Sequence, residues 1–136
     1  MFIAYICLLA LALVFTATQE KVLNAMKPEN RLMNPTAVWL QWIPVFNFFW
    51  QFVVGIQISR SASNEKVGFK PTLAVGLTCS TLSTMYLLLV FTDIPQTIPG
   101  LVIPYLIALF ASWVVYWILL AQLKQAILRK AALSAA

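Results

Sequence analysis

Long apolar segments alternate with short polar ones along this chain. Uncharged apolar runs cover roughly residues 2–18, 37–58, 72–91 and 101–120, and the segments between them hold nearly all of the charges. About 20 apolar residues in a helix are enough to cross a hydrocarbon core about 30 Å thick. The pattern predicts an all-α integral membrane protein, one domain over residues 1–136, with helices at about 2–26, 35–58, 71–91 and 100–130.

Prolines and capping residues mark the expected helix ends. The first run has no basic residue before it, unlike a secretory signal, so we expect an uncleaved helix. Pro28 ends that helix, and Asn34 followed by Pro35 is an N-cap and first-turn pair that opens the second. Beyond Tyr116 the apolar positions keep helical spacing between polar ones, which predicts an amphipathic C-terminal extension.

The second run, from Trp39 to Ile58, carries polar residues on one face of the expected helix. At about 100° per residue they fall within a sector of roughly 120°, opposite the tryptophans. They are Gln41, Pro44, Asn47, Gln51 and Gly55. Amides are costly in hydrocarbon unless they are hydrogen-bonded, so this face should meet another helix, a partner or water. We interpret it as a seam of interhelical hydrogen bonds, with a polar pathway as the alternative.

A second stripe of small residues recurs at every fourth position of the third run. It consists of Thr72, Gly76, Ser80 and Thr84. Small residues at this spacing share a helix face and let two helices approach closely in lipid. The stripe predicts a helix-packing seam, and the lining of a pathway is again the alternative. The aromatic residues of the last helix are expected in an interfacial belt or in helix packing: Tyr105, Trp113, Tyr116 and Trp117.

Two topologies compete for the second run, which Pro44 should kink. If all four runs span, both termini are cytoplasmic and the basic residues divide six to three, with Lys21, Lys27 and Arg31 on the minority side. If the second run re-enters by the face it left, all nine share one side, and Asp93 lies opposite. The uncharged stretch 37–58 is long enough to cross. The four-span bundle is therefore favoured, and the re-entrant segment is the alternative.

Composition supports the membrane assignment. Hydrophobic residues make up 62% of the chain and charged residues 10%, whereas a soluble domain has roughly 45–50% and 25%. The net charge of +5 comes from basic residues that flank the apolar runs, so it predicts attraction to anionic lipid head groups rather than nucleic-acid binding. Lys124, Arg129 and Lys130 are expected to anchor the C-terminal extension to those head groups.

The sequence offers little chemistry. It contains no histidine, and its two cysteines, Cys7 and Cys79, lie inside apolar runs where they act as small hydrophobic residues. No disulfide, metal site or cofactor is predicted. The apolar runs also lack charged groups that could act as a general acid or base, so we do not expect an enzyme.

A short motif suggests a family. Trp42-x-Pro44-x-x-Asn47, followed by Val53-Val54 and then by Ser59-Arg60-Ser61, resembles the signature of an uncharacterised group of small bacterial four-span membrane proteins. The resemblance covers about a fifth of the chain, and Gln51 stands where that group often has proline. It implies a helical bundle in the bacterial inner membrane and nothing about mechanism.

The functional hypothesis follows from this combination of features. A chain with packing seams, an aromatic outer face and almost no extramembrane part is expected to be an accessory or scaffolding subunit of a larger membrane complex. Its partners would be membrane lipids and larger membrane subunits or copies of itself. The alternative is a small oligomeric channel or transporter that uses the two polar stripes as its pathway.

Overall fold

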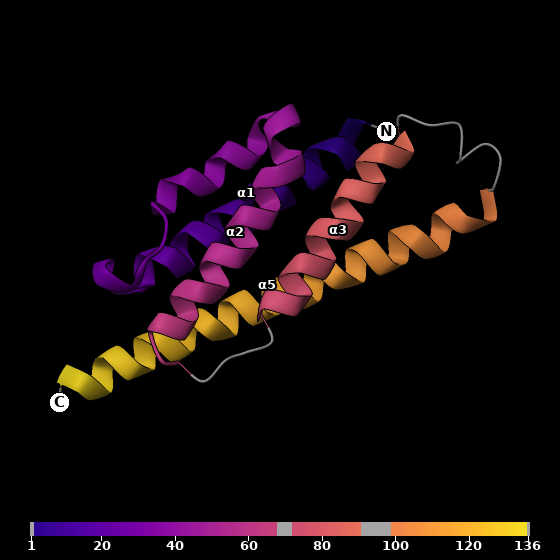
Figure 1. Ribbon diagram of the computed structural model, residues 1–136. Helices are drawn as coiled ribbons and strands as arrows, with labels where there is room; N and C mark the ends of the chain where they lie inside the picture. Colours follow the sequence, from indigo (N-terminus) through magenta and orange to yellow (C-terminus); the bar gives the residue numbers. More distant parts are fainter. Residues whose placement is uncertain (1, 68–71, 91–98, 136) are drawn as a thin grey trace.

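The computed structural model describes residues 2–67, 72–90 and 99–135, and all of its regular elements are helices (Figure 1). The α-helices are α1 (Phe2–Ala25), α2 (Pro44–Asn64), α3 (Thr72–Val90) and α5 (Pro99–Ala135). Two 3-10 helices, η1 (Pro28–Asn30) and η2 (Pro35–Trp42), lie between α1 and α2. The all-α prediction is confirmed. The last helix is longer than expected at both ends and includes Pro104 in its interior.

The helices form a closed ring of neighbours. α1 contacts α5, α5 contacts α3, α3 contacts α2, α2 contacts η2, and η2 returns to α1. α5 runs the length of the molecule, so that the N- and C-termini lie at opposite ends (Figure 1). The short η2 therefore acts as one wall of a ring whose other walls are longer helices.

The second apolar run is divided into two helices instead of one. η2 ends at Trp42, Ile43 is extended with φ −81° and ψ 115°, and Pro44 opens α2. A proline inside a helix lacks an N–H and clashes with the preceding turn, and it drives the residue before it out of the helical region. Here Pro44 sits at a first helical position, where neither cost arises. The prediction of one helix over 35–58, kinked at Pro44, is wrong, because two helices meet there instead.

η2 and α2 fold back on each other as a hairpin. The indole Nε1 of Trp50 on α2 donates to the Ala37 carbonyl oxygen on η2 at 2.7 Å. At the base of the hairpin the Leu32 N–H donates to Ser61 Oγ at 3.0 Å. The segment therefore enters and leaves at the same end of the molecule. The re-entrant alternative expects this arrangement, and the favoured four-span bundle is not confirmed.

Asn34 caps η2 as expected. Its Oδ1 accepts hydrogen bonds from the Thr36 N–H at 3.1 Å and from Thr36 Oγ1 at 2.9 Å, and Pro35 occupies the first helical position. The sequence therefore located the start of this helix correctly. It missed the 3-10 geometry that follows.

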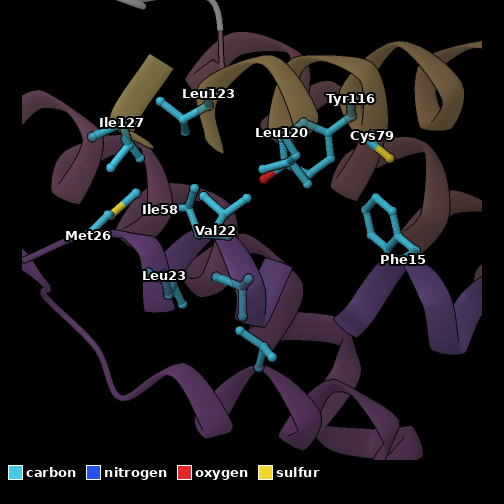
Figure 2. Close-up of a cluster of buried hydrophobic side chains, with 13 residues drawn as sticks. Phe15, Val22, Leu23, Met26, Ile58, Cys79, Tyr116, Leu120, Leu123 and Ile127 are labelled. Atoms are coloured by element: carbon cyan, nitrogen blue, oxygen red, sulfur yellow. The ribbon is translucent and has the colours of Figure 1, made fainter. Parts of the chain in front are cut away.

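The hydrophobic core gathers where α1, α2 and the second half of α5 meet (Figure 2). Val22, Leu23 and Ile58 are fully buried there, together with Leu120 and Leu123. Ile127 closes the cluster. The apolar face of the predicted C-terminal extension thus packs against the rest of the protein.

Basic residues collect at this end of the molecule, which we call the basic end. Glu65, directly after α2, joins its parts: its Oε1 accepts from the Lys27 N–H at 2.5 Å, and its carbonyl oxygen accepts from Lys130 Nζ. The basic residues in the described ranges lie in or just after the last turns of α1 and α2, or in the last third of α5. They are Lys21, Lys27, Arg31, Arg60, Lys66, Lys124, Arg129 and Lys130. Lys70 and Asp93 lie outside those ranges.

The outer surface is strongly apolar. Val45 and Phe49 near the hairpin tip are 78% and 75% exposed, and Ile103 and Ile107 on α5 are also exposed. Among the described residues, one segment, Gly100–Ser134, is long and apolar enough to cross a membrane, and only 17% of its most apolar stretch is buried. Low burial distinguishes this helix from the core helix of a soluble protein.

A candidate binding pocket inside the helical ring

A pocket of about 240 Å³ lies at the centre of the ring, and every wall of the ring contributes to it. α1 supplies Ala12, Phe15, Thr16 and Gln19; η2 supplies Gln41 and Trp42; α2 supplies Asn47 and Gln51; α3 supplies Cys79, Ser80 and Ser83; α5 supplies Trp113 and Tyr116. The sequence-predicted residues Gln41, Asn47, Gln51 and Ser80 are therefore brought together around one cavity.

Two indole hydrogen bonds hold the 3-10 helix η2 against the α-helix α1, and the spacing of residues along the two helices matches. Trp39 Nε1 donates to Glu20 Oε2 at 2.9 Å, and Trp42 Nε1 donates to Thr16 Oγ1 at 3.1 Å. In a 3-10 helix, residues three apart lie on the same face and are separated by about 6 Å along the axis. In an α-helix, residues four apart are also separated by about 6 Å along the axis. Both tryptophans therefore reach residues one turn apart on α1.

Gln41 faces α1 rather than the helix that follows it. Its Nε2 donates to Gln19 Oε1 at 2.7 Å and lies 3.5 Å from Thr16 Oγ1. Gln19 and Thr16 are both buried, and Thr16 Oγ1 also donates to the Ala12 carbonyl oxygen of its own helix. The expected single stripe from Gln41 to Gly55 is thus split, because the chain reverses at Ile43.

Gln51 and Gly55 of α2 meet the small-residue stripe of α3. Gln51 Nε2 donates to Thr84 Oγ1 at 2.7 Å, and Ser80 Oγ donates to the Gln51 carbonyl oxygen at 3.3 Å. Gly55 lies one turn from Gln51 on α2, and Gly76 lies two turns from Thr84 on α3. A Cβ added to Gly55 would be 3.8 Å from the carbonyl carbon of Gly76. The two stripes therefore form a close seam of hydrogen bonds and glycines between α2 and α3.

The remaining predicted seam residues are Pro44, Thr72 and Asn47. Pro44 contributes the first residue of α2, and Thr72 the first residue of α3, with both side chains outside the described set. Asn47 is half-buried beside the pocket, and its side-chain amide makes no hydrogen bond to the described part of the chain. Asn47 differs in this respect from Gln41 and Gln51.

Tyr116 is a site residue that the stripes did not reveal. Its side chain is almost fully buried, lines the pocket, and has a hydroxyl without a hydrogen-bond partner among the residues described here. Its ring faces Gly76, where an added Cβ would approach within 3.1 Å. Trp113 and Trp117 pack against Phe15, with centroids 4.9 and 6.3 Å away. These aromatics belong to helix packing rather than to a surface belt.

The predicted head-group anchor residues have different surroundings. Lys130 is tied to the Glu65 carbonyl oxygen, Lys124 is half-buried, and Arg129 is exposed. Lys130 thus also links α5 to the end of α2. All three lie at the basic end, on the last third of α5.

The pocket is polar but uncharged. Its lining consists of amides, hydroxyls, a thiol, aromatic rings and alanine, with no carboxylate, lysine or arginine. Within residues 2–67, 72–90 and 99–135 no group of three or more cysteine, aspartate or glutamate side chains could hold a metal ion. The structure is thus that of a helical protein with an uncharged pocket between its helices. Comparison with protein-family models, curated proteins and solved structures found no match, so the W-x-P-x-x-N resemblance stays a prediction.

Proposed function

We propose that this chain is a small integral membrane protein that serves as a non-catalytic accessory or scaffolding subunit of a larger membrane complex. In this proposal α1, α3 and α5 cross the bilayer. The hairpin formed by η2 and α2 re-enters from the side of the basic end. The W-x-P-x-x-N resemblance suggests the bacterial inner membrane as its location.

The observation that carries the proposal is the exposed apolar surface. Exposure of apolar side chains to water is unfavourable by about 25 cal/mol per Å² of apolar surface. The exposed side chains include Val45, Phe49, Ile103 and Ile107. Exposed apolar faces of this extent belong against lipid or against another protein. α1 from Phe2 to Thr18 and the whole of α3 contain no charged residue, as is expected of helices within hydrocarbon.

The charge distribution supports an orientation. The basic residues in the described ranges all lie at one end, and loops rich in lysine and arginine stay on the cytoplasmic side. In this proposal the basic end, with the C-terminus of α5, faces the cytoplasm. Anionic lipids there would add about 1 kcal/mol of attraction per basic residue near the surface.

Purification in a mild detergent tests the accessory role. We expect the protein to elute with larger membrane proteins, which mass spectrometry would then identify. As a matched control, the same tag on an unrelated three-span protein should not recover those partners. Elution as a single species of the chain's own mass would contradict the proposal.

A second function, an oligomeric channel or transporter, is favoured by one observation only. The amide-lined pocket lies inside the ring of helices, where a pathway would run. Liposomes that contain the pure protein would then conduct a solute, and Asn47→Leu would reduce the flux without changing assembly. Flux that is indistinguishable from empty liposomes would argue against this function.

A further inference from the structure

The polar pocket adjoins an apolar groove. A second cavity, of about 550 Å³, shares Ala12, Ser83 and Trp113 with the pocket and is otherwise lined by Tyr86, Leu106, Leu109 and Phe110. These residues lie on the halves of α3 and α5 farther from the basic end. The two spaces are therefore adjacent, the polar one behind the hairpin and the apolar one between α1, α3 and α5.

The polar pocket contains hydrogen-bonding groups that the protein leaves unused. The side-chain amide of Asn47 makes no hydrogen bond to the described residues, and the Tyr116 hydroxyl is buried without a partner among them. Gln51 uses its amide nitrogen for Thr84, and its side-chain oxygen accepts no hydrogen bond within the described ranges. Of these groups the Tyr116 hydroxyl is buried, and a buried polar group without a partner costs free energy that a hydrogen-bonding ligand would recover. Asn47 and Gln51 are half-buried.

The lining also limits the charge of the ligand. No charged side chain is present to neutralise a phosphate or carboxylate in the pocket, and an unpaired ion in such surroundings is strongly disfavoured. The volume of about 240 Å³ exceeds the roughly 150 Å³ of a cavity that holds benzene. The space therefore suits a small uncharged head group joined to an apolar chain.

We propose that the pocket and groove together bind one lipid-soluble amphiphile with an uncharged, oxygen-bearing head. The head hydrogen-bonds to Asn47 and Gln51, and the tail lies along Leu106, Leu109 and Phe110. Quinones with an alkyl tail and acylglycerols share this chemistry. The inference rests on the membrane location proposed above, because the tail groove would reach a source of such ligands only within a bilayer.

Tryptophan quenching in the full-length protein tests this binding, since Trp42 and Trp113 line the pocket. The protein is incorporated into phosphatidylcholine nanodiscs and titrated with decylubiquinone and with a dibromostearoyl glycerol, both of which quench indole fluorescence. Phosphatidylglycerol with the same brominated chains is the charged control. We expect saturable quenching by at least one uncharged probe and only gradual, unsaturable quenching by the charged lipid.

A pair of variants separates pocket binding from contact with surrounding lipid. Asn47→Leu should weaken the saturable binding about threefold to tenfold, which corresponds to one lost hydrogen bond. Gln57→Leu makes the same kind of change on the same helix, outside the pocket lining, and should leave the binding unchanged. The probe that saturates identifies the source: decylubiquinone a quinone, the brominated glyceride an acylglycerol.

Three results would overturn the proposal: no saturable quenching by either uncharged probe, equal saturation by the charged lipid, or the same affinity in Asn47→Leu and Gln57→Leu. The first result needs no variant, so it stands even if a substitution prevents folding. Failure of the protein to enter nanodiscs at all would instead refute the membrane location. The two failures are therefore distinguishable.

Discussion

Gly76 and Tyr116 show that the packing of the helices depends on single side chains. The Tyr116 ring reaches across from α5 and occupies the space that a side chain on Gly76 would need. Gly55 faces the same region from α2. Three helices can meet at this point because two of them present glycine to the third, which presents a tyrosine.

Replacing Gly76 by alanine is expected to destabilise the protein. The new Cβ would lie 3.1 Å from two ring atoms of Tyr116, and overpacking of this kind costs about 1–3 kcal/mol. Thermal unfolding in detergent, followed by circular dichroism, would show a lower transition temperature. Gly100→Ala is the matched control, because a Cβ there meets nothing within 4 Å. Equal transition temperatures for the two variants would contradict this account.

The spacing of residues in the sequence predicted the glycine side of this contact but not the tyrosine side. The four-residue repeat from Gly76 to Thr84 and the Gln51 and Gly55 positions predicted a close seam, and α2 and α3 meet there. Tyr116 could not be predicted, because its burial depends on the rotation of α5. That rotation is set partly by contacts remote in sequence, such as the 3.1 Å hydrogen bond from Trp117 Nε1 to Thr18 Oγ1.

At the level of elements, the hairpin of η2 and α2 is the feature that gives the pocket two of its five walls. Ser61 and Glu65 hold its base to Leu32 and Lys27, while Trp50 holds its two arms together. These bonds place the polar ends of the hairpin at the basic end. The tip, at Ile43 and Val45, is exposed and apolar.

Cysteine labelling tests whether both ends of the hairpin lie on one side of the membrane. In a chain with Cys7→Ala and Cys79→Ala, Leu32→Cys and Ser63→Cys add thiols at exposed positions before and at the end of the hairpin. A membrane-impermeant maleimide should label both in inverted vesicles and neither in intact cells. Gly100→Cys, near the opposite end, is the control that should react in intact cells. Labelling of Leu32→Cys and Ser63→Cys from opposite sides would restore the four-span bundle.

The reversal at Pro44 marks the limit of prediction from local sequence. Proline indicated a disturbed helix, and the cap at Asn34 was predicted from two residues. Whether a proline kinks a helix or ends it depends on what can satisfy the freed groups. Here the decisive contacts come from Ser61 and from α1 residues far away in sequence.

At the scale of the whole molecule, burial is unevenly distributed along its length. The fully buried cluster lies toward the basic end, whereas the opposite half carries the groove and exposed residues such as Ile6 and Ile103. The stability of the protein should therefore depend mainly on contacts at the basic end. The second half of α5, which contributes Leu120, Leu123 and Ile127 to that cluster, is central to it.

Two shortened chains test this division of stability. Ending the chain after Gln122 removes buried Leu123 and Ile127, each worth about 2 kcal/mol or more, and should abolish or strongly reduce the folded protein recovered. Ending it after Lys130 removes residues such as Leu133, which is 81% exposed, and should leave stability nearly unchanged. Yield and thermal unfolding in detergent measure both effects, and similar losses in the two chains would show that the basic end is not the stabilising half.

The match in spacing between η2 and α1 has a mechanical consequence. Trp39 and Trp42 are hydrogen-bonded to Glu20 and Thr16 on α1. A slip of η2 by one residue would rotate each indole by about 120° away from its partner. Both indoles therefore keep their hydrogen bonds in this register and lose them after a one-residue slip. The width of the pocket behind the hairpin depends on that register, because Gln41 and Trp42 of η2 line it.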